Sequence, residues 1–534
     1  MKINVPENFN FGYDVVDAWA AEQPDKPALL WTNDQGECRQ FTFADMKRYT
    51  DMTASYFQSL GIGHGDMVML ILKRRYEFWF SIVALHKLGA VVIPATHLLT
   101  KKDIVYRCNA ADIKMIVCAG ESVITDHITA AMPESPSVKR LVSVGPEAPE
   151  GFEDFHKGIE AAAPFVKPEH PNTNDDISLM YFTSGTTGVS KGVLRTQQMV
   201  RDHALVLAIA NEPSETPEAI LTPAPLYHTA GLFCILKSAA LAATLILVSS
   251  FDPEKICRQI ESRKATEVLM LPPISYQRLY QSEAARKYDL SSVRLALVTA
   301  GKCTKACIDD IFEMFPNCKL RPSWGSTEVC SATGCNLSRQ QLRERPELMS
   351  TVGRLNALVE VRIVDETGAQ VPVGVPGEAL VRSPLVFKGY LGREDEQDGI
   401  FVDGWFRTED IMRVDADGYY YLVDRKRDIV KTGGENVYAQ EIERVLQSHP
   451  AVMDSAVVGV PDPRFGEAIA AAIVLNPGAE LSADELLDFC AANLASYKKP
   501  RYWALLDSLP ENSVGKVQKN VLRENAAKIF TRIA

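Results

Sequence analysis

Buried-strand patterns alternate with helical patterns along the first two thirds of the chain. Residues 43–60 have helical apolar spacing and end at Gly61, and residues 67–72 form an apolar run typical of a buried strand. The pattern continues with a helix through Phe78, Ile82 and Leu85, a strand at 90–94, a helix at 102–109 and a strand at 115–118. Further strands are predicted at 219–225, 244–248, 268–271 and 295–298. This alternation predicts two similar α/β halves built on parallel sheets.

The pattern changes from about residue 359. Short β-rich segments with Gly and Pro between them predict a small β-barrel. Five consecutive charges at 424–428 follow, typical of a linker or a solvated face. Beyond them we expect a compact α+β unit, with helices at 439–447 and 483–493 and strands at 455–460, 469–475 and 502–506.

Length and composition indicate a multidomain enzyme of the cytoplasm. A chain of 534 residues is too long for one core, so we expect at least two domains. The net charge of −11 argues against nucleic acid as a main partner. The N-terminus has no apolar run typical of a signal peptide, and Lys237 interrupts the apolar stretch at 230–250, which favours a core helix and strand over a membrane span.

The 11 cysteines are scattered and lack the spacing of zinc ligands. They are typical of reduced cytosolic thiols that fill small buried sites. Two close pairs, Cys303 with Cys307 and Cys330 with Cys335, leave a metal or redox role as the alternative.

A glycine- and hydroxyl-rich stretch follows the apolar segment 177–182. Its sequence is Thr183-Ser184-Gly185-Thr186-Thr187-Gly188-Val189-Ser190-Lys191-Gly192. Glycines let backbone N–H groups converge on an anion, hydroxyls add donors and Lys191 adds positive charge, so we interpret the stretch as a phosphate loop. It is not a Walker A motif, because Ser190 precedes the lysine where glycine is required. A plain surface turn is the alternative.

Three further motifs follow in order: Ser323-Trp324-Gly325-Ser326-Thr327-Glu328, Gly404-Trp405-Phe406-Arg407-Thr408-Glu409-Asp410 and Gly515-Lys516-Val517. Together with the loop they resemble the adenylate-forming superfamily of acyl-CoA synthetases, carrier-protein adenylation domains and luciferases, over essentially the whole chain. Residues 8–11 and 103–107 look like medium-chain acyl-CoA synthetases, and 433–438 is similar to aryl and general acyl-CoA ligases. The resemblance implies an N-terminal adenylation domain at 1–424, made of two α/β subdomains and the barrel, a hinge at 425–427 and a rotating α+β domain at 428–534.

The resemblance also implies an ATP site. The residues that would hold the β- and γ-phosphates are Thr183, Ser184, Gly185, Thr186, Thr187 and Lys191. Thr327 would bond the α-phosphate, Glu328 would ligate Mg²⁺, and Lys516 would stabilise the charge that develops as the carboxylate attacks. The nucleoside would lie against Gly301, Trp324, Asp410 and Arg425. Trp324 stands where the family usually has Tyr, and Glu409 stands where Gly is usual.

CoA and the acid have implied sites as well. Arg427 would be the hinge pivot, where Asp or Lys is usual, and Gly433, Gly434 and Glu435 would line the pantetheine tunnel, with an ordinary Gly-Gly turn as the alternative. Residues near the acyl chain or its carboxylate would be His228, Thr229, Ala300, Lys302, Val329, Cys330 and Ala332. His228 occupies the place of the Asp that pairs an amino group, which disfavours amino acids. Lys302 either receives a second carboxylate or polar substituent, or points to solvent.

The expected function is therefore an ATP-dependent carboxylic acid–CoA ligase that uses ATP, Mg²⁺ and CoA. It would form an acyl-adenylate and then a thioester from a small aromatic or medium-chain acid. The first alternative is a free-standing enzyme that loads a carrier-protein phosphopantetheine, and the remote alternative is an inactive nucleotide sensor. A homodimer remains open.

Overall fold

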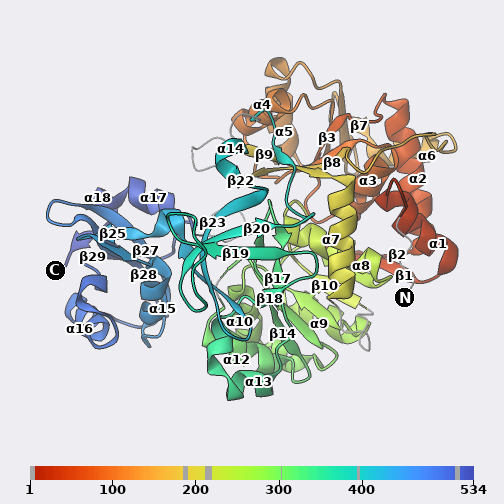
Figure 1. Cartoon of the computed structure of the whole chain (residues 1–534). Helices are drawn as coiled ribbons and strands as arrows, with labels where there is room; N and C mark the ends of the chain where they lie inside the picture. The colour runs from red at the N-terminus through yellow and green to blue at the C-terminus, as the bar shows by residue number, and fades with distance from the viewer. Residues whose placement is uncertain (1–5, 184–189, 211–218, 302, 394–396, 512–516) are drawn as a thin grey trace. The chain divides into compact units, whose positions relative to one another are not determined.

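The computed structural model describes residues 6–183, 190–210, 219–301, 303–393, 397–511 and 517–534 (Figure 1). The chain divides into two compact units, Met1–Glu360 with Arg382–Gly404, and Val361–Val381 with Trp405–Ala534. The larger unit is mixed α/β and holds two large sheets. The domain limits predicted at 424 and 428 differ from this division and stay a prediction, as does rotation of the second domain.

The first sheet of the larger unit has the strand order β21-β9-β8-β4-β3-β5-β6-β7. The strands are β3 Met67–Ile71, β4 Val91–Pro94, β5 Met115–Ala119, β6 Arg140–Val144, β7 Glu153–Asp154, β8 Ile177–Thr183, β9 Lys191–Thr196 and β21 Gly389–Tyr390. The pairs from β8 to β7 are parallel, whereas β8 with β9 and β9 with β21 are antiparallel. The phosphate-loop stretch therefore joins two antiparallel neighbours at one side of an otherwise parallel sheet.

The second sheet has the order β14-β13-β12-β10-β11-β1-β2. Its strands are β1 Pro27–Thr32, β2 Cys38–Thr42, β10 Ala219–Thr222, β11 Thr244–Val248, β12 Glu267–Leu269, β13 Leu295–Val298 and β14 Lys319–Pro322. All pairs are parallel except β1 with β2. An early segment thus joins the sheet of the second half, with Leu29 opposite Leu245.

Helices connect and flank these strands. The main ones are α2 Phe43–Ser59, α3 Tyr76–Lys87, α4 Lys101–Ala110, α5 Ser122–Ala131, α7 Gln197–Ile209, α8 Thr229–Ala240, α9 Pro253–Arg263, α10 Ile274–Gln281 and α12 Lys305–Met314. Local sequence determines where they begin. In α2, the Thr42 hydroxyl accepts a hydrogen bond from the Asp45 backbone N–H at 3.1 Å, and the Asp45 carboxylate accepts one from the Thr42 backbone N–H. Lys237 on α8 is buried with Glu267, at 2.5 Å between Nζ and Oε2, which confirms a core helix rather than a membrane span at 230–250.

The smaller unit contains two β structures. Strands β19 Glu360–Val364, β20 Gly377–Arg382, β23 Trp405–Val414 and β24 Tyr420–Arg425 follow one another in a sheet, with β20–β23 and β23–β24 antiparallel. This is the region of the predicted barrel, and closure into a barrel stays a prediction. The second structure is built on a long antiparallel pair, β27 Val452–Asp462 and β28 Gly466–Leu475 (blue in Figure 1).

That pair anchors the predicted α+β unit. The neighbouring elements are β25 Val430–Thr432, β26 Glu435–Val437, β29 Tyr502–Leu505, β30 Thr531–Arg532, α15 Ala439–Leu446, α16 Ala483–Asn493 and α17 Lys519–Glu524. Buried aliphatic residues from α15, α16 and the sheet form its core. Each predicted helix and strand of this region is therefore present.

Two composition-based expectations can be compared with the structure. All 11 cysteines are free thiols, and within the described ranges no cluster of His, Cys, Asp and Glu has the makings of a metal site. No helix in those ranges is both long enough and apolar enough to cross a bilayer.

Candidate active site

A tight hairpin carries the motif residues Thr327 and Glu328. Strand β15 Gly325–Ser326 pairs with β16 Cys330–Ser331 in antiparallel register, so the two motif residues lie at the turn. Gly325 is required by packing, because a Cβ there would stand 1.6 Å from the carbonyl oxygen of Cys330. The hairpin thus fixes where the Glu328 side chain begins.

Two hydroxyl groups hold the Glu328 carboxylate. Ser326 Oγ donates to Oε2 at 2.8 Å and accepts the Glu328 N–H at 3.1 Å, while Tyr390 Oη donates to Oε1 at 3.1 Å. Each carboxylate oxygen keeps acceptor capacity beyond these contacts. Mg²⁺ in phosphate-binding sites often takes one or two protein carboxylates and several phosphate or water oxygens, so this half-buried carboxylate fits the predicted role.

Lys191 lies on the same side of the site as Tyr390. Its Nζ is 4.9 Å from the centre of the Tyr390 ring, and Tyr390 pairs with Val193 across β21 and β9. Thr183 pairs with Lys191, so the two ends of the phosphate-loop stretch are adjacent. One aromatic ring therefore connects the cation of the loop with the carboxylate of the hairpin.

The residues of the larger unit that are predicted to touch the nucleoside or the acid come from the hairpin, the start of α8 and the turn after β13, and Thr229 and Cys330 line one cavity. Trp324 is buried, and its backbone N–H donates to Thr333 Oγ1 at 3.0 Å, which fixes the backbone before the hairpin. His228 is the N-cap residue of α8, and Thr229 is the first residue of that helix. Val329, Cys330 and Ala332 are buried in the hairpin and just after it.

Ala300 and Gly301 follow β13 in a constrained turn. Ala300 has φ +61°, and a Cβ at Gly301 would stand 2.9 Å from Cδ of Pro273. Both residues are exposed. A ligand can therefore approach the backbone of this turn closely, as the prediction for Gly301 requires.

In the smaller unit, Asp410 and Arg425 lie next to each other, as expected of two residues predicted to bind the same ribose. They are opposite each other in β23 and β24, and Arg425 Nε lies 3.5 Å from Asp410 Oδ1. Glu409, the residue that departs from the family pattern, has φ +58°. The left-handed conformation explains why glycine suits this position and indicates that the departure strains the backbone.

The remaining predicted residues of this unit lie on its surface. Arg427 is exposed, and its neighbour Asp428 pairs with Arg523 at 2.6 Å. Gly433 and Gly434 have φ +59° and +88° and join β25 to β26, and Glu435 is exposed. The Gly-Gly turn is real, and its role in a tunnel stays a prediction.

Six predicted residues lie outside the described ranges: Ser184, Gly185, Thr186, Thr187, Lys302 and Lys516. Conversely, the structure brings two unpredicted residues to the site. Tyr390 carries no motif signal, because its partner Glu328 is distant in the chain. Arg195 gives a readable signal, since it is a charge in a strand whose neighbours Val193 and Leu194 are apolar.

Comparison with known proteins identifies the family of the chain. The family model for AMP-binding enzymes matches residues 16–391, and the model for their C-terminal domain matches 441–516. Feruloyl-CoA synthase from Amycolatopsis sp is 31% identical over 90% of this chain and 93% of its own, and long-chain-fatty-acid–CoA ligase FadD13 from Mycobacterium tuberculosis is 30% identical over 91% and 93%. The structure of ATP-bound MatB from Rhodopseudomonas palustris is similar with a TM-score of 0.84 and 28% identity, covering 96% of this chain and 99% of that one.

The chain therefore belongs to the AMP-binding enzyme family, the adenylate-forming superfamily inferred from its motifs. Within it, the chain belongs to the acyl-CoA synthetase branch, whose members are AMP-forming ligases that use ATP and CoA.

Proposed function

We propose that this protein joins an aromatic or medium-chain carboxylic acid to CoA by way of an acyl-adenylate, with the residues described above in stated roles. The observation that carries the proposal is the linked set of Lys191, Tyr390 and Glu328 beside the phosphate-loop stretch. Family membership supplies the reaction class, and the names of relatives include both an aromatic and a fatty acid.

Adenylation brings a carboxylate to the α-phosphorus of ATP and expels pyrophosphate. Two anions must meet, so positioning and charge neutralisation supply most of the acceleration. Lys191 and the loop would bind the leaving phosphates, Thr327 would bond the α-phosphate, and Trp324 would stack on adenine. Glu328 would hold Mg²⁺, which supplies further neutralisation when bound.

In the second half-reaction the thiol of CoA attacks the carbonyl carbon of the acyl-adenylate and expels AMP. Asp410 and Arg425 would keep the ribose of the adenylate in place after pyrophosphate has left and until the thiol attacks. Rotation about Arg427 would remove Lys516 from the site and bring Gly433 and Gly434 to the pantetheine chain.

ATP–pyrophosphate exchange across a panel of acids tests the proposal. We expect exchange that depends on Mg²⁺ and on an aromatic or medium-chain acid, and acyl-CoA on addition of CoA. Absence of exchange with every acid contradicts adenylation, whereas exchange without acyl-CoA contradicts CoA as the acceptor and favours a carrier protein.

The variant Lys516→Ala separates the two half-reactions. It is expected to abolish exchange, because the charge in the adenylation transition state loses its partner, and to leave a supplied acyl-adenylate able to react with CoA. Exchange at the parent rate would exclude this role for Lys516.

A further inference from the structure

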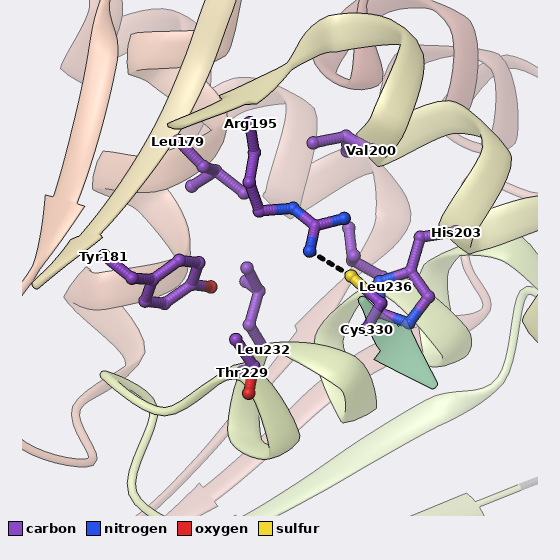
Figure 2. Close-up of a pocket in the computed structure, with 9 residues that line it drawn as sticks. All are labelled: Leu179, Tyr181, Arg195, Val200, His203, Thr229, Leu232, Leu236 and Cys330. Carbon is purple, nitrogen blue, oxygen red and sulfur yellow. Dashed lines mark hydrogen bonds between the residues drawn. The ribbon is translucent and has the colours of Figure 1, made fainter. Parts of the chain in front are cut away.

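A narrow cavity beside the Thr327–Glu328 hairpin is lined by three polar side chains from different elements (Figure 2). Tyr181 comes from β8, Arg195 from β9 and His203 from α7. The rest of the wall is mostly leucine and valine, and it includes Thr229 and Cys330, two of the residues predicted to lie near the acid. The cavity volume is about 10 Å³, which is room for about one water molecule. The cavity therefore suits a small terminal group rather than a length of acyl chain.

Each of the three polar residues has an atom without a hydrogen-bond partner. The atoms are Tyr181 Oη, Arg195 Nη2 and His203 Nε2, on side chains whose residues are 4%, 2% and 5% exposed. Leaving one such buried group unsatisfied costs about 1–3 kcal/mol, and more when the group is charged. Three such atoms on the wall of one cavity offer hydrogen bonds to a polar group that enters it.

The positive charge of Arg195 is also unbalanced. Its Nη1 donates to the Thr327 carbonyl oxygen at 3.4 Å and contacts Cys330 Sγ, and burial raises the pKa of that thiol, so the thiol is neutral. In the part of the chain that the structure describes, no carboxylate forms an ion pair with Arg195. A buried guanidinium in this state calls for an anion.

The two other groups are neutral and can donate hydrogen bonds, His203 in the tautomer that carries its proton on Nε2. Burial lowers the pKa of His203 to about 3 and raises the pKa of Tyr181, so at neutral pH the imidazole is uncharged and the phenol is protonated. One positive charge and two neutral groups match an anionic oxygen. A methyl terminus would satisfy none of the three.

We propose that Arg195, Tyr181 and His203 bind a second carboxylate of the substrate, at the end opposite the carboxylate that is activated. The substrate class is therefore dicarboxylic acids that are ligated to CoA at one end. This inference rests on the proposed ligase function. It assigns to Arg195 the role that the sequence left open for Lys302.

The test compares acids that differ only in the second carboxylate: adipate with hexanoate, suberate with octanoate, and terephthalate with benzoate. CoA-dependent AMP release gives kcat/KM for each acid, and the ratio of diacid to monoacid is the readout. We expect the parent enzyme to prefer the diacid in at least one pair by about 10-fold or more, the effect of a charge-assisted hydrogen bond.

Variants then assign the preference to the cluster. Arg195→Leu is expected to lower the diacid-to-monoacid ratio by at least about 10-fold, because kcat/KM falls for the diacid and stays the same for the monoacid. Tyr181→Phe is expected to lower the ratio by several-fold, and Arg195→Lys to keep part of the preference that Arg195→Leu loses. The matched control Arg343→Leu, on an exposed residue of the helix Arg339–Glu344, leaves the ratio unchanged.

Four outcomes are distinguishable. A parent preference for monoacids in every pair overturns the proposal, as does an equal loss on both acids in Arg195→Leu, which would make Arg195 a support of the hairpin only. Higher kcat/KM for 4-hydroxybenzoate than for terephthalate assigns the cluster to a neutral hydroxyl and also overturns it. Failure to activate any acid contradicts the ligase function itself, which pyrophosphate exchange reports separately.

Discussion

Replacement of Gly325 by alanine tests whether the hairpin positions Glu328 for catalysis. The added Cβ would meet the Cys330 carbonyl oxygen at 1.6 Å, so reaching ordinary contact needs a displacement of about 1.8 Å. The obstacle is backbone, and the two strands of the hairpin must separate. A displacement of about 1 Å at a catalytic group costs on the order of 100-fold in rate.

We expect Gly325→Ala to lower the ATP–pyrophosphate exchange rate by about 100-fold or more. The loss of unfolding free energy should stay at about 1–3 kcal/mol, because the substitution disturbs one short hairpin. The matched control is Gly63→Ala, where a Cβ meets nothing within 4 Å. Circular dichroism and urea unfolding check that both variants fold. Exchange by Gly325→Ala within about three-fold of the parent would show that the hairpin does not set the geometry of the site.

Three further predictions concern other contacts. Tyr390→Phe removes the donor to Glu328 but keeps the ring near Lys191, so exchange should fall about 10-fold and need more Mg²⁺, as a Mg²⁺ titration would show; an unchanged titration contradicts the contact. Lys237→Met leaves the Glu267 carboxylate buried and should cost about 3–5 kcal/mol in urea unfolding, against less than about 1 kcal/mol for Lys305→Met in an exposed pair. Burial holds the pKa of His86 at about 4 against an ordinary 6.5, so its contribution to stability is complete above pH 6.5 and is lost as pH falls toward 4. Between pH 7 and pH 5 the unfolding free energy of His86→Leu should therefore fall by about 2 kcal/mol less than that of the parent, as urea unfolding at the two pH values would show. The exposed variant His127→Leu should lose as much as the parent.

Local pattern was sufficient for much of the fold. The strands Thr244–Val248 and Leu295–Val298 and the helix Ala483–Asn493 have the predicted bounds, because apolar periodicity and flanking turn residues mark them in the chain. The pairing of β1 with β11 was not predictable, since Leu29 and Leu245 are distant and periodicity does not encode partners. Strand β9 was not predicted, and its antiparallel pairing with β8 departs from the predicted parallel sheets, because periodicity does not encode strand direction.

The candidate site divides in the same way. Motif residues such as Glu328 and Asp410 were found because their neighbours in sequence carry the signal. Tyr390 acts through a contact with a residue far along the chain, so no local pattern marks it. Arg195 also contacts a distant residue, but its charge beside apolar neighbours in a strand is a signal that the sequence does carry. Glu409 is an intermediate case: the sequence exposed the departure from glycine, and the φ of +58° supplied its physical meaning.

The most direct test of the central claim is the stoichiometry of one complete reaction. The enzyme is incubated with ATP, Mg²⁺, CoA and the acid that gives the greatest exchange, and acyl-CoA, AMP and pyrophosphate are quantified together. Equal amounts of the three products are expected, since each turnover expels pyrophosphate and then AMP. Formation of ADP and phosphate, or consumption of ATP without acyl-CoA, would contradict it.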